Sequence, residues 1–201
     1  MVAALGPVVA ITLAAVSLDA HAQRDSAGRS PGPVTPVDTV DLDRYAGRWY
    51  EVARFPNSFQ EDCTAETMAE YERLSNGQIR VVNTCRQADG TVKRAEGRAK
   101  LADRDGPTSK LKVRFAPAFL SFLPMVWGNY WVLDLTEDYS AALVGDPRRE
   151  YLWILSRTPV LADTAYRRMV DAAAGQGFDV RRLRRSPVAA DSMPAPVPSP
   201  E

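Results

Sequence analysis

Short runs in which apolar and polar residues alternate fill most of the chain between residues 47 and 157. Such alternation is typical of β-strands that have one enclosed face and one wet face. Turn sequences such as Asn76-Gly77 and Asp89-Gly90 separate several of the runs and favour hairpin links. We therefore expect eight strands, at about 47–55, 64–74, 78–86, 91–102, 109–115, 129–135, 140–145 and 150–157.

A helical period appears only after the last of these strands. Asp163 is a suitable cap, and apolar residues recur on one face until the Gly175-Gln176-Gly177 stop. Phe178-Asp179-Val180 suggests a last short strand. This order predicts an all-β protein, an eight-stranded antiparallel up-and-down barrel with one C-terminal α-helix packed outside. A β-sandwich is the competing architecture, and the barrel is favoured because closure removes exposed strand edges.

The two ends of the chain differ in composition from its middle. Residues 1–22 join an apolar run to the small-x-small sequence Ala20-His21-Ala22, which predicts a cleaved secretory signal peptide. No Lys or Arg precedes the run, so an uncleaved anchor or a misplaced start is the alternative. We expect a flexible leader at 23–40, the barrel domain at 41–185 and a disordered tail at 186–201.

Composition argues against several classes of function. The chain has 25 basic and 25 acidic residues, so nucleic acid is not expected as its main partner. The single histidine, His21, lies in the predicted signal peptide, and its removal excludes Ser-His-Asp catalysis and histidine-ligated metal sites. We therefore expect a protein that is not an enzyme and that uses no metal and no cofactor. No cysteine near Ala22 offers an acceptor for a lipid anchor, which favours a soluble exported protein.

Cys63 and Cys85 are the two cysteines of the chain, and in an exported protein such a pair suggests a disulfide. Both fall on the same strand face. A hairpin at Asn76-Gly77 sets Cys85 opposite about residue 67, however, so a bridge requires the segment around Cys63 to bend back over the strand ends. Two free buried thiols are the alternative. In that case an inward Cys85 thiol that modifies lipid is the least favoured functional hypothesis.

Three stretches that occur in order carry a resemblance to a known family. Gly47-Arg48-Trp49-Tyr50 resembles the first signature of the lipocalins, and Tyr151 to Pro159 resembles the signature of their last strand. Thr136 to Tyr139 resembles the middle signature, with its Asp-Tyr pair displaced. The chain from about 41 to 184 is most similar to the bacterial lipocalin and apolipoprotein D branch. The resemblance implies that Gly47, Trp49 and Arg157 close one barrel end, with the arginine packed over the tryptophan.

The bacterial members of that branch look like lipoproteins anchored through a cysteine that this sequence lacks, so outer-membrane association stays open. The resemblance also implies a barrel that takes a lipid tail, with the polar head near the mouth. We expect storage or transport of a fatty acid, lysophospholipid or similar small hydrophobic ligand in the cell envelope. The alternative is that the inward side chains simply fill the barrel. Strand parity and resemblance select as ligand-binding residues Phe55, Tyr71, Asn83, Val113, Phe115, Tyr130, Val132 and Trp153.

The connection between the fifth and sixth strands, residues 116–128, is long and apolar. Because loops of an up-and-down barrel alternate between its two ends, this one is expected at the mouth, opposite Trp49. Exposed apolar loops of this size usually mark an interaction surface. The loop is predicted to touch a membrane, to gate the ligand or to bind a protein, and an inward-folded lid is the alternative. Its candidate contact residues are Phe119, Phe122, Leu123 and Trp127.

Overall fold

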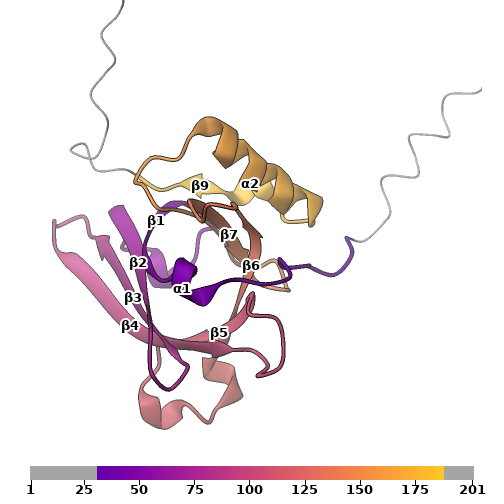
Figure 1. Ribbon diagram of the computed structural model, residues 1–201. Helices are drawn as coiled ribbons and strands as arrows, with labels where there is room; N and C mark the ends of the chain where they lie inside the picture. Colours follow the sequence, from indigo (N-terminus) through magenta and orange to yellow (C-terminus); the bar gives the residue numbers. More distant parts are fainter. Residues whose placement is uncertain (1–30, 188–201) are drawn as a thin grey trace, which may run out of the picture. The chain divides into compact units, whose positions relative to one another are not determined.

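A computed structural model describes residues 31–187, and Figure 1 looks along a barrel of strands with a helix laid against its outside. The barrel closes because β1 pairs with both β8 and β2, while every other strand pairs with its neighbours in the sequence. The prediction of an eight-stranded up-and-down barrel is therefore confirmed. The strands are β1 (Gly47–Arg54), β2 (Ala65–Arg73), β3 (Ile79–Arg86), β4 (Val92–Leu101), β5 (Lys110–Arg114), β6 (Gly128–Leu135), β7 (Ala141–Gly145) and β8 (Leu152–Ser156).

The described residues contain two α-helices, α1 (Leu42–Tyr45) and α2 (Asp163–Gly175). α1 begins at Asp41, whose carboxylate accepts hydrogen bonds from the backbone N–H groups of the next turn. Asp163 is the first residue of α2 rather than its cap, since the cap position belongs to Ala162, whose methyl group cannot accept a hydrogen bond. The predicted capping role of Asp163 is therefore wrong. No helix within 31–187 combines the length and apolar character needed to cross a bilayer.

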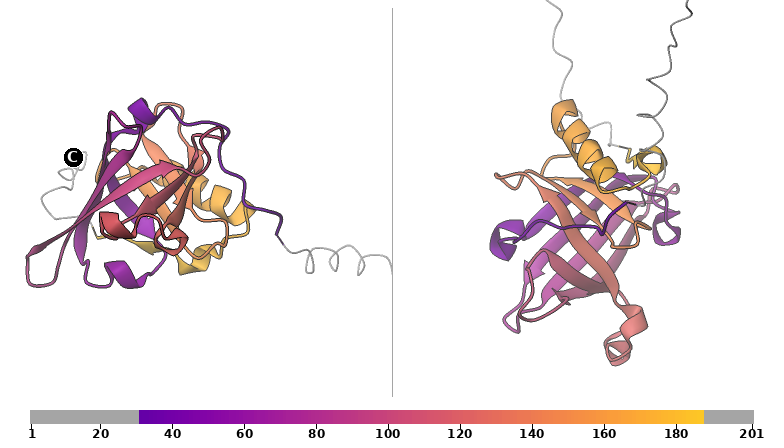
Figure 2. Two further views of the ribbon diagram at one scale, coloured as in Figure 1. Left: turned by 90° about the horizontal axis from the view of Figure 1, so that it is seen from below. Right: turned by 90° about the vertical axis from the view of Figure 1, so that its right-hand side faces the viewer.

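The last strand lies a few residues later than expected. Residues 180–182 form a short 3-10 helix, and β9 (Arg184–Arg185) pairs with β1 at Ala53 and Arg54. The strand predicted at 178–180 is therefore wrong, because Phe178 turns its ring into the core beneath α2 instead of extending a ladder. Figure 2 shows α2 lying along one side of the barrel, clear of both of its ends.

Apolar side chains gather in two layers that the barrel wall separates. The outer layer fills the space between the wall and α2 and includes Val52, Phe55, Leu133, Leu143, Ile154, Met169 and Phe178. The inner layer fills part of the barrel and includes Tyr45, Trp49, Tyr71, Ile79, Val81, Ala99, Leu111, Val132, Val144 and Leu155. Along each strand, successive residues alternate between the inner layer and the outer face of the wall, which α2 covers on one side of the barrel only.

A bulge in β1 moves the end of that strand from the inner layer to the outer one. Trp49 and Glu51 have the inward parity, and the pairing with β8 shifts between Glu51 and Ala53. Phe55 then lies outside the barrel, with its ring 6.2 Å from that of Phe178. The predicted inward position of Phe55 is wrong, because one extra residue reverses the alternation on which parity depends.

The segment before α1 packs along the barrel. Val34 and Val40 are buried, and the Val37 N–H donates to the carbonyl oxygen of Val132 at 3.0 Å. The Thr108 hydroxyl accepts a hydrogen bond from the Val40 N–H at 2.8 Å. Composition alone places these residues in the leader. The predicted signal peptide, residues 23–30 of the leader and residues 188–201 of the tail lie outside the described part of the chain.

Candidate ligand-binding site

One end of the barrel is closed by a tryptophan and an arginine from opposite ends of the domain. Trp49 has no exposed surface, and its indole N–H donates to the carbonyl oxygen of Tyr45 at 2.8 Å. The guanidinium carbon of Arg157 lies 3.9 Å from the centre of the Trp49 ring. Arg157 also donates to the carbonyl oxygens of Arg48 and Arg44, at 2.8 and 2.6 Å. Gly47, at a φ of 90°, has no side chain to crowd this guanidinium.

Three tyrosines belong to the same inner layer as Trp49, and we call them the tyrosine triad: Tyr45, Tyr71 and Tyr130. The Tyr130 hydroxyl is hydrogen bonded to that of Tyr45 at 2.8 Å and to that of Tyr71 at 2.9 Å. Burial raises the pKa of all three phenols, that of Tyr71 to about 12, so they remain neutral at physiological pH. Tyr45 and Tyr71 are buried, whereas Tyr130 is partly exposed.

The inner layer around Trp49 and the triad forms the closed half of the barrel. Towards the loops that follow β1, β3 and β5, the inward residues change in character. Asn83 and Ala95 lie opposite one another on β3 and β4, and each is partly exposed although it faces inward. Val113 and Trp153 share this intermediate exposure. Solvent therefore reaches this open half of the interior, whereas side chains fill the closed half.

Gly97 on β4 does not contribute to the ligand space, because its neighbour Phe115 occupies the room that a side chain would take. A Cβ on Gly97 would lie 2.8 Å from the ring of Phe115, so the glycine makes room for that ring rather than for a ligand. Phe115 follows the end of β5 and is 42% exposed, which places it at the mouth. Of the predicted ligand-binding residues, the structure brings together in the interior Tyr71, Asn83, Val113, Tyr130, Val132 and Trp153, leaves Phe115 at the mouth and places Phe55 outside.

An ion pair that sequence reasoning missed lies on the inner side of β1. The Glu51 carboxylate accepts hydrogen bonds from Arg54 and from the Gln60 amide, both at 2.6 Å. Gln60 in turn accepts the indole N–H of Trp153 at 3.1 Å. The Ser186 hydroxyl, just beyond β9, also donates to Glu51 at 2.5 Å. Glu51 shares the parity of the inward Trp49, which was the one signal available, but the bulge hides the inward position of Arg54.

The disulfide fixes the loop between β1 and β2 at the open end. Cys63 and Cys85 are bonded, with their Cα atoms 5.5 Å apart, so the predicted bridge is confirmed. The Thr64 N–H donates to the carbonyl oxygen of Arg86 at 2.8 Å, which bends the segment back over β3 as a bridge requires. Because both cysteines of the chain are consumed, the thiol-dependent enzyme hypothesis lacks its nucleophile. Within 31–187 no group of His, Cys, Asp and Glu is placed to hold a metal ion.

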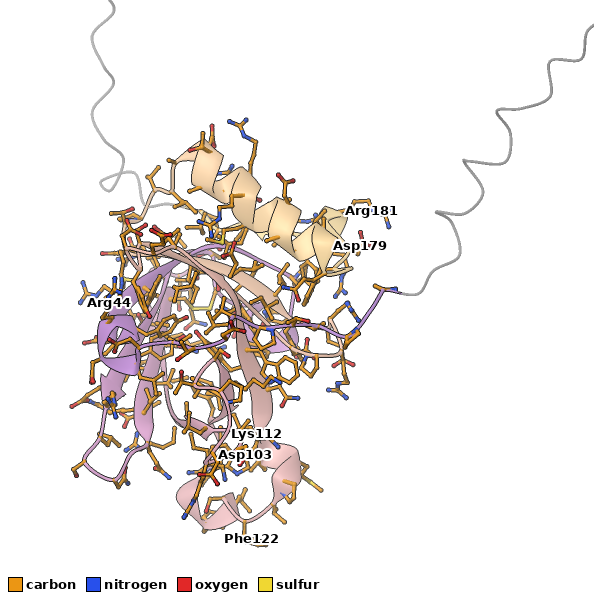
Figure 3. All side chains as sticks on the ribbon, turned by 45° about the vertical axis from the view of Figure 1, so that its right-hand side comes forward. Arg44, Asp103, Lys112, Phe122, Asp179 and Arg181 are labelled. Carbon is orange, nitrogen blue, oxygen red and sulfur yellow. A yellow bond between two sulfur atoms is a disulfide. The ribbon has the colours of Figure 1, made fainter. Side chains whose placement is uncertain are left out.

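Exposed apolar side chains gather around the open end, and we call them the apolar rim: Phe59, Val92, Phe115, Phe119, Phe122 and Met125. The loop between β5 and β6 contributes the most exposed of them, with Phe122 at 76% and Met125 at 86%. Figure 2 shows this loop projecting away from the barrel, and Figure 3 labels Phe122 at its far end. The loop therefore does not fold inward as a lid.

Two of the four predicted contact residues of that loop, Leu123 and Trp127, pack against the protein and are not at the exposed end of the loop. Leu123 is partly buried, and Trp127 lies beneath Lys100, whose amine is 4.3 Å from the indole ring centre. The Trp127 indole N–H donates to the carbonyl oxygen of Ser121 at 2.8 Å, which holds the loop in its projecting form. Met125, which the prediction omitted, is the most exposed large apolar side chain described.

An eight-stranded barrel that is closed at one end, with partly exposed inward side chains towards the other, has the architecture of the barrels that enclose one small ligand. Residues 40–188 match the model of the lipocalin-like domain, and the chain belongs to that family. Lipocalins bind or transport small hydrophobic ligands and are generally not enzymes. The geometry of the barrel interior is consistent with such a binding role.

Similar proteins come from plants, bacteria and animals. Temperature-induced lipocalin-1 of Arabidopsis thaliana is 41% identical over 152 residues, which cover 75% of this chain and 81% of that protein. Outer membrane lipoprotein Blc of Escherichia coli K12 is 38% identical, covering 76% and 82%. Apolipoprotein D of Mus musculus is 31% identical, covering 86% and 89%. The structure of insecticyanin from Manduca sexta superposes with a TM-score of 0.62 at 21% identity, covering 81% and 88%, and shares the fold.

Proposed function

We propose that the protein stores or transports a fatty acid, lysophospholipid or similar amphiphile, held in the open half of its barrel. The observation that carries this proposal is the set of inward residues that solvent reaches, because a fully packed core leaves no such surface. Each buried methylene of a lipid tail contributes about 0.8 kcal/mol, so a medium-length tail offsets its ordering costs. The Glu51–Arg54 pair and Gln60 lie where a polar head would rest near the mouth.

The proposed setting is the cell envelope. The predicted signal peptide supports export, and relatives named outer membrane lipoprotein support an envelope location. We propose a periplasmic protein that meets the inner face of the outer membrane. Fractionation of cells that express the full chain tests this: recovery in the osmotic-shock fluid supports it, and retention in the cytoplasm contradicts it.

The ligand proposal is tested by native mass spectrometry of the purified protein, followed by displacement of a fluorescent fatty acid. The variant Ala95→Trp places an indole in the open half and is expected to weaken binding more than about tenfold, because it removes the space that the tail needs. Thr91→Trp, on the exposed turn before β4, is the matched control and should bind as wild type does. Absence of any co-purified lipid together with no displacement by fatty acids would contradict the proposal.

The apolar rim supports a second proposal, that the mouth rests on a lipid surface while ligand is exchanged. Among the described large apolar side chains that are exposed, Val160 alone lies away from the open end. Lys112 on β5 and Lys100 beside it on β4, whose amine lies over the Trp127 ring, form no ion pair within residues 31–187 and supply positive charge next to the projecting loop for anionic headgroups.

Vesicle sedimentation tests the rim. The variant F119S/F122S/M125S is expected to lose binding to vesicles of phosphatidylglycerol and phosphatidylcholine, while V160S binds as wild type does. Unchanged sedimentation of the triple variant would contradict the membrane proposal. A protein retained by wild type but not by the triple variant, from a membrane-free extract, would instead favour a protein partner at the rim.

A further inference from the structure

The hydroxyl groups of the tyrosine triad do not satisfy one another completely. Three phenol groups carry three donor hydrogens, but the triad contains two hydrogen bonds, both made through Tyr130. In every arrangement of those bonds one hydroxyl hydrogen is left over. Within 31–187 these hydroxyls form no other hydrogen bond. A buried donor without an acceptor is costly, so this hydrogen favours an additional oxygen next to the triad.

The position of the triad relates this donor to the ligand site. Tyr45 and Tyr71 are 3% and 7% exposed and belong to the closed half. Tyr130 is the member that is partly exposed, and it lies on the boundary between the two halves. A ligand that fills the open half therefore meets the triad with its innermost end.

The charges around the site limit the kind of oxygen that fits. Arg157 lies over Trp49 at the closed end, and its guanidinium donates to three backbone carbonyl oxygens. Arg54, the other inward-side cation near the ligand space, is paired with Glu51. A carboxylate or phosphate beside the triad would have one donor and no free cation, which is insufficient for a buried charge. An uncharged acceptor meets the single donor without that penalty.

We propose that the tyrosine triad is a ligand subsite, which takes an uncharged acceptor oxygen, such as a ketone, ester or amide carbonyl, at the buried end of the ligand. This inference rests on the proposed function, since it concerns ligands held in the open half. It predicts selectivity that apolar burial does not supply: two ligands of equal shape are distinguished by one oxygen atom at the inner end.

A matched pair of ligands tests the subsite. 2-Undecanone and 2-methyl-1-undecene have the same shape and differ in a carbonyl oxygen replaced by a methylene group. Their dissociation constants are measured by displacement of a fluorescent fatty acid from wild type and from Y45F/Y71F/Y130F. This variant removes donors and acceptors together and keeps the ring shapes, a change that is nearly neutral for folding. Y50F/Y166F, which removes two phenol hydroxyls for which no hydrogen bond is described, is the control.

The expected result is a loss in the variant of about fivefold in the affinity of the ketone relative to the alkene, the worth of one net hydrogen bond. The control variant should keep the wild-type ratio. An unchanged ratio in the triad variant, with both ligands still bound, overturns the subsite and leaves the proposed function intact. Failure of both ligands, and of the fatty acid probe, to bind wild type overturns the proposed function as well.

Discussion

The closed and open halves of the barrel are built on the same strands, yet they are packed in different ways. In the closed half, Trp49 has no exposed surface, and Arg157 covers its outer side. In the open half, Asn83 and Ala95 face inward and still meet solvent. The comparison indicates that large aromatic side chains supply stability at one end, while small ones at the other leave space for a ligand.

A pair of tryptophan substitutions tests this division and has the largest expected effect. Trp49→Ala removes a fully buried ring and should lower the free energy of unfolding by about 3–5 kcal/mol. Trp153→Ala removes a partly exposed ring from the open half and should cost less stability but weaken ligand binding. Urea denaturation and fatty acid displacement measure the two effects. If the two variants lost equal stability and both kept the wild-type affinity for the fatty acid, the distinction between the two halves would be contradicted.

Removal of the disulfide tests whether the structure of the open half depends on a covalent link. C63S/C85S opens a link between residues 22 positions apart and should lower the free energy of unfolding by about 3 kcal/mol. Hydrogen exchange should then increase in the loop between β1 and β2 and stay slow near Trp49. Uniformly faster exchange in both halves would show that the bridge supports the whole barrel instead.

Replacement of the closing arginine has a smaller expected effect. Arg157→Lys keeps the positive charge but loses the planar group that lies over Trp49 and donates to several carbonyl oxygens. We expect a loss of about 1–2 kcal/mol in the free energy of unfolding, measured in urea, and unchanged fatty acid affinity. A variant that kept full stability but lost the ligand would place Arg157 in the site rather than in the closure.

The pH dependence of stability offers a finer test of the closed half. The folded-state pKa of Tyr71 is raised to about 12 by burial, above the value near 10 of an unfolded tyrosine. Its contribution to stability is therefore complete below pH 10 and declines as the pH rises towards 12, because the unfolded chain releases the proton first. Tyrosinate absorbance at 295 nm should show late ionisation in wild type that is reduced in Y71F by one tyrosine, because burial also raises the pKa of Tyr45 and Tyr130.

Much of the fold follows from alternation alone, because every second residue of a strand faces the enclosed side of the wall. Tyr71, Val113 and Tyr130 were placed inward for this reason, and the structure places them there. Phe55 was misplaced because a bulge breaks the repeat, and nothing in the local residue types marks the bulge. The alternation predicts correctly which face a residue occupies up to such an inserted residue, and it predicts the opposite face after it.

Other features of the site depend on contacts between distant segments. Gln60 meets Glu51 and Trp153 only after the disulfide loop has bent back, and the triad joins residues from α1, β2 and β6. No spacing rule connects such residues. The length and apolar composition of residues 116–128 nevertheless indicated an exposed loop. They could not distinguish its exposed end at Met125 from Trp127, which packs against Lys100.

The central claim, that the open half of the barrel holds the ligand, is tested most directly by nuclear Overhauser contacts between bound palmitate and the methyl groups of the protein. We predict contacts from the methylene protons of the ligand to the methyl groups of Ala95 and Val113, and none to Met169 in the outer layer. Contacts confined to Met169, Val160 or other positions outside the barrel would contradict the account.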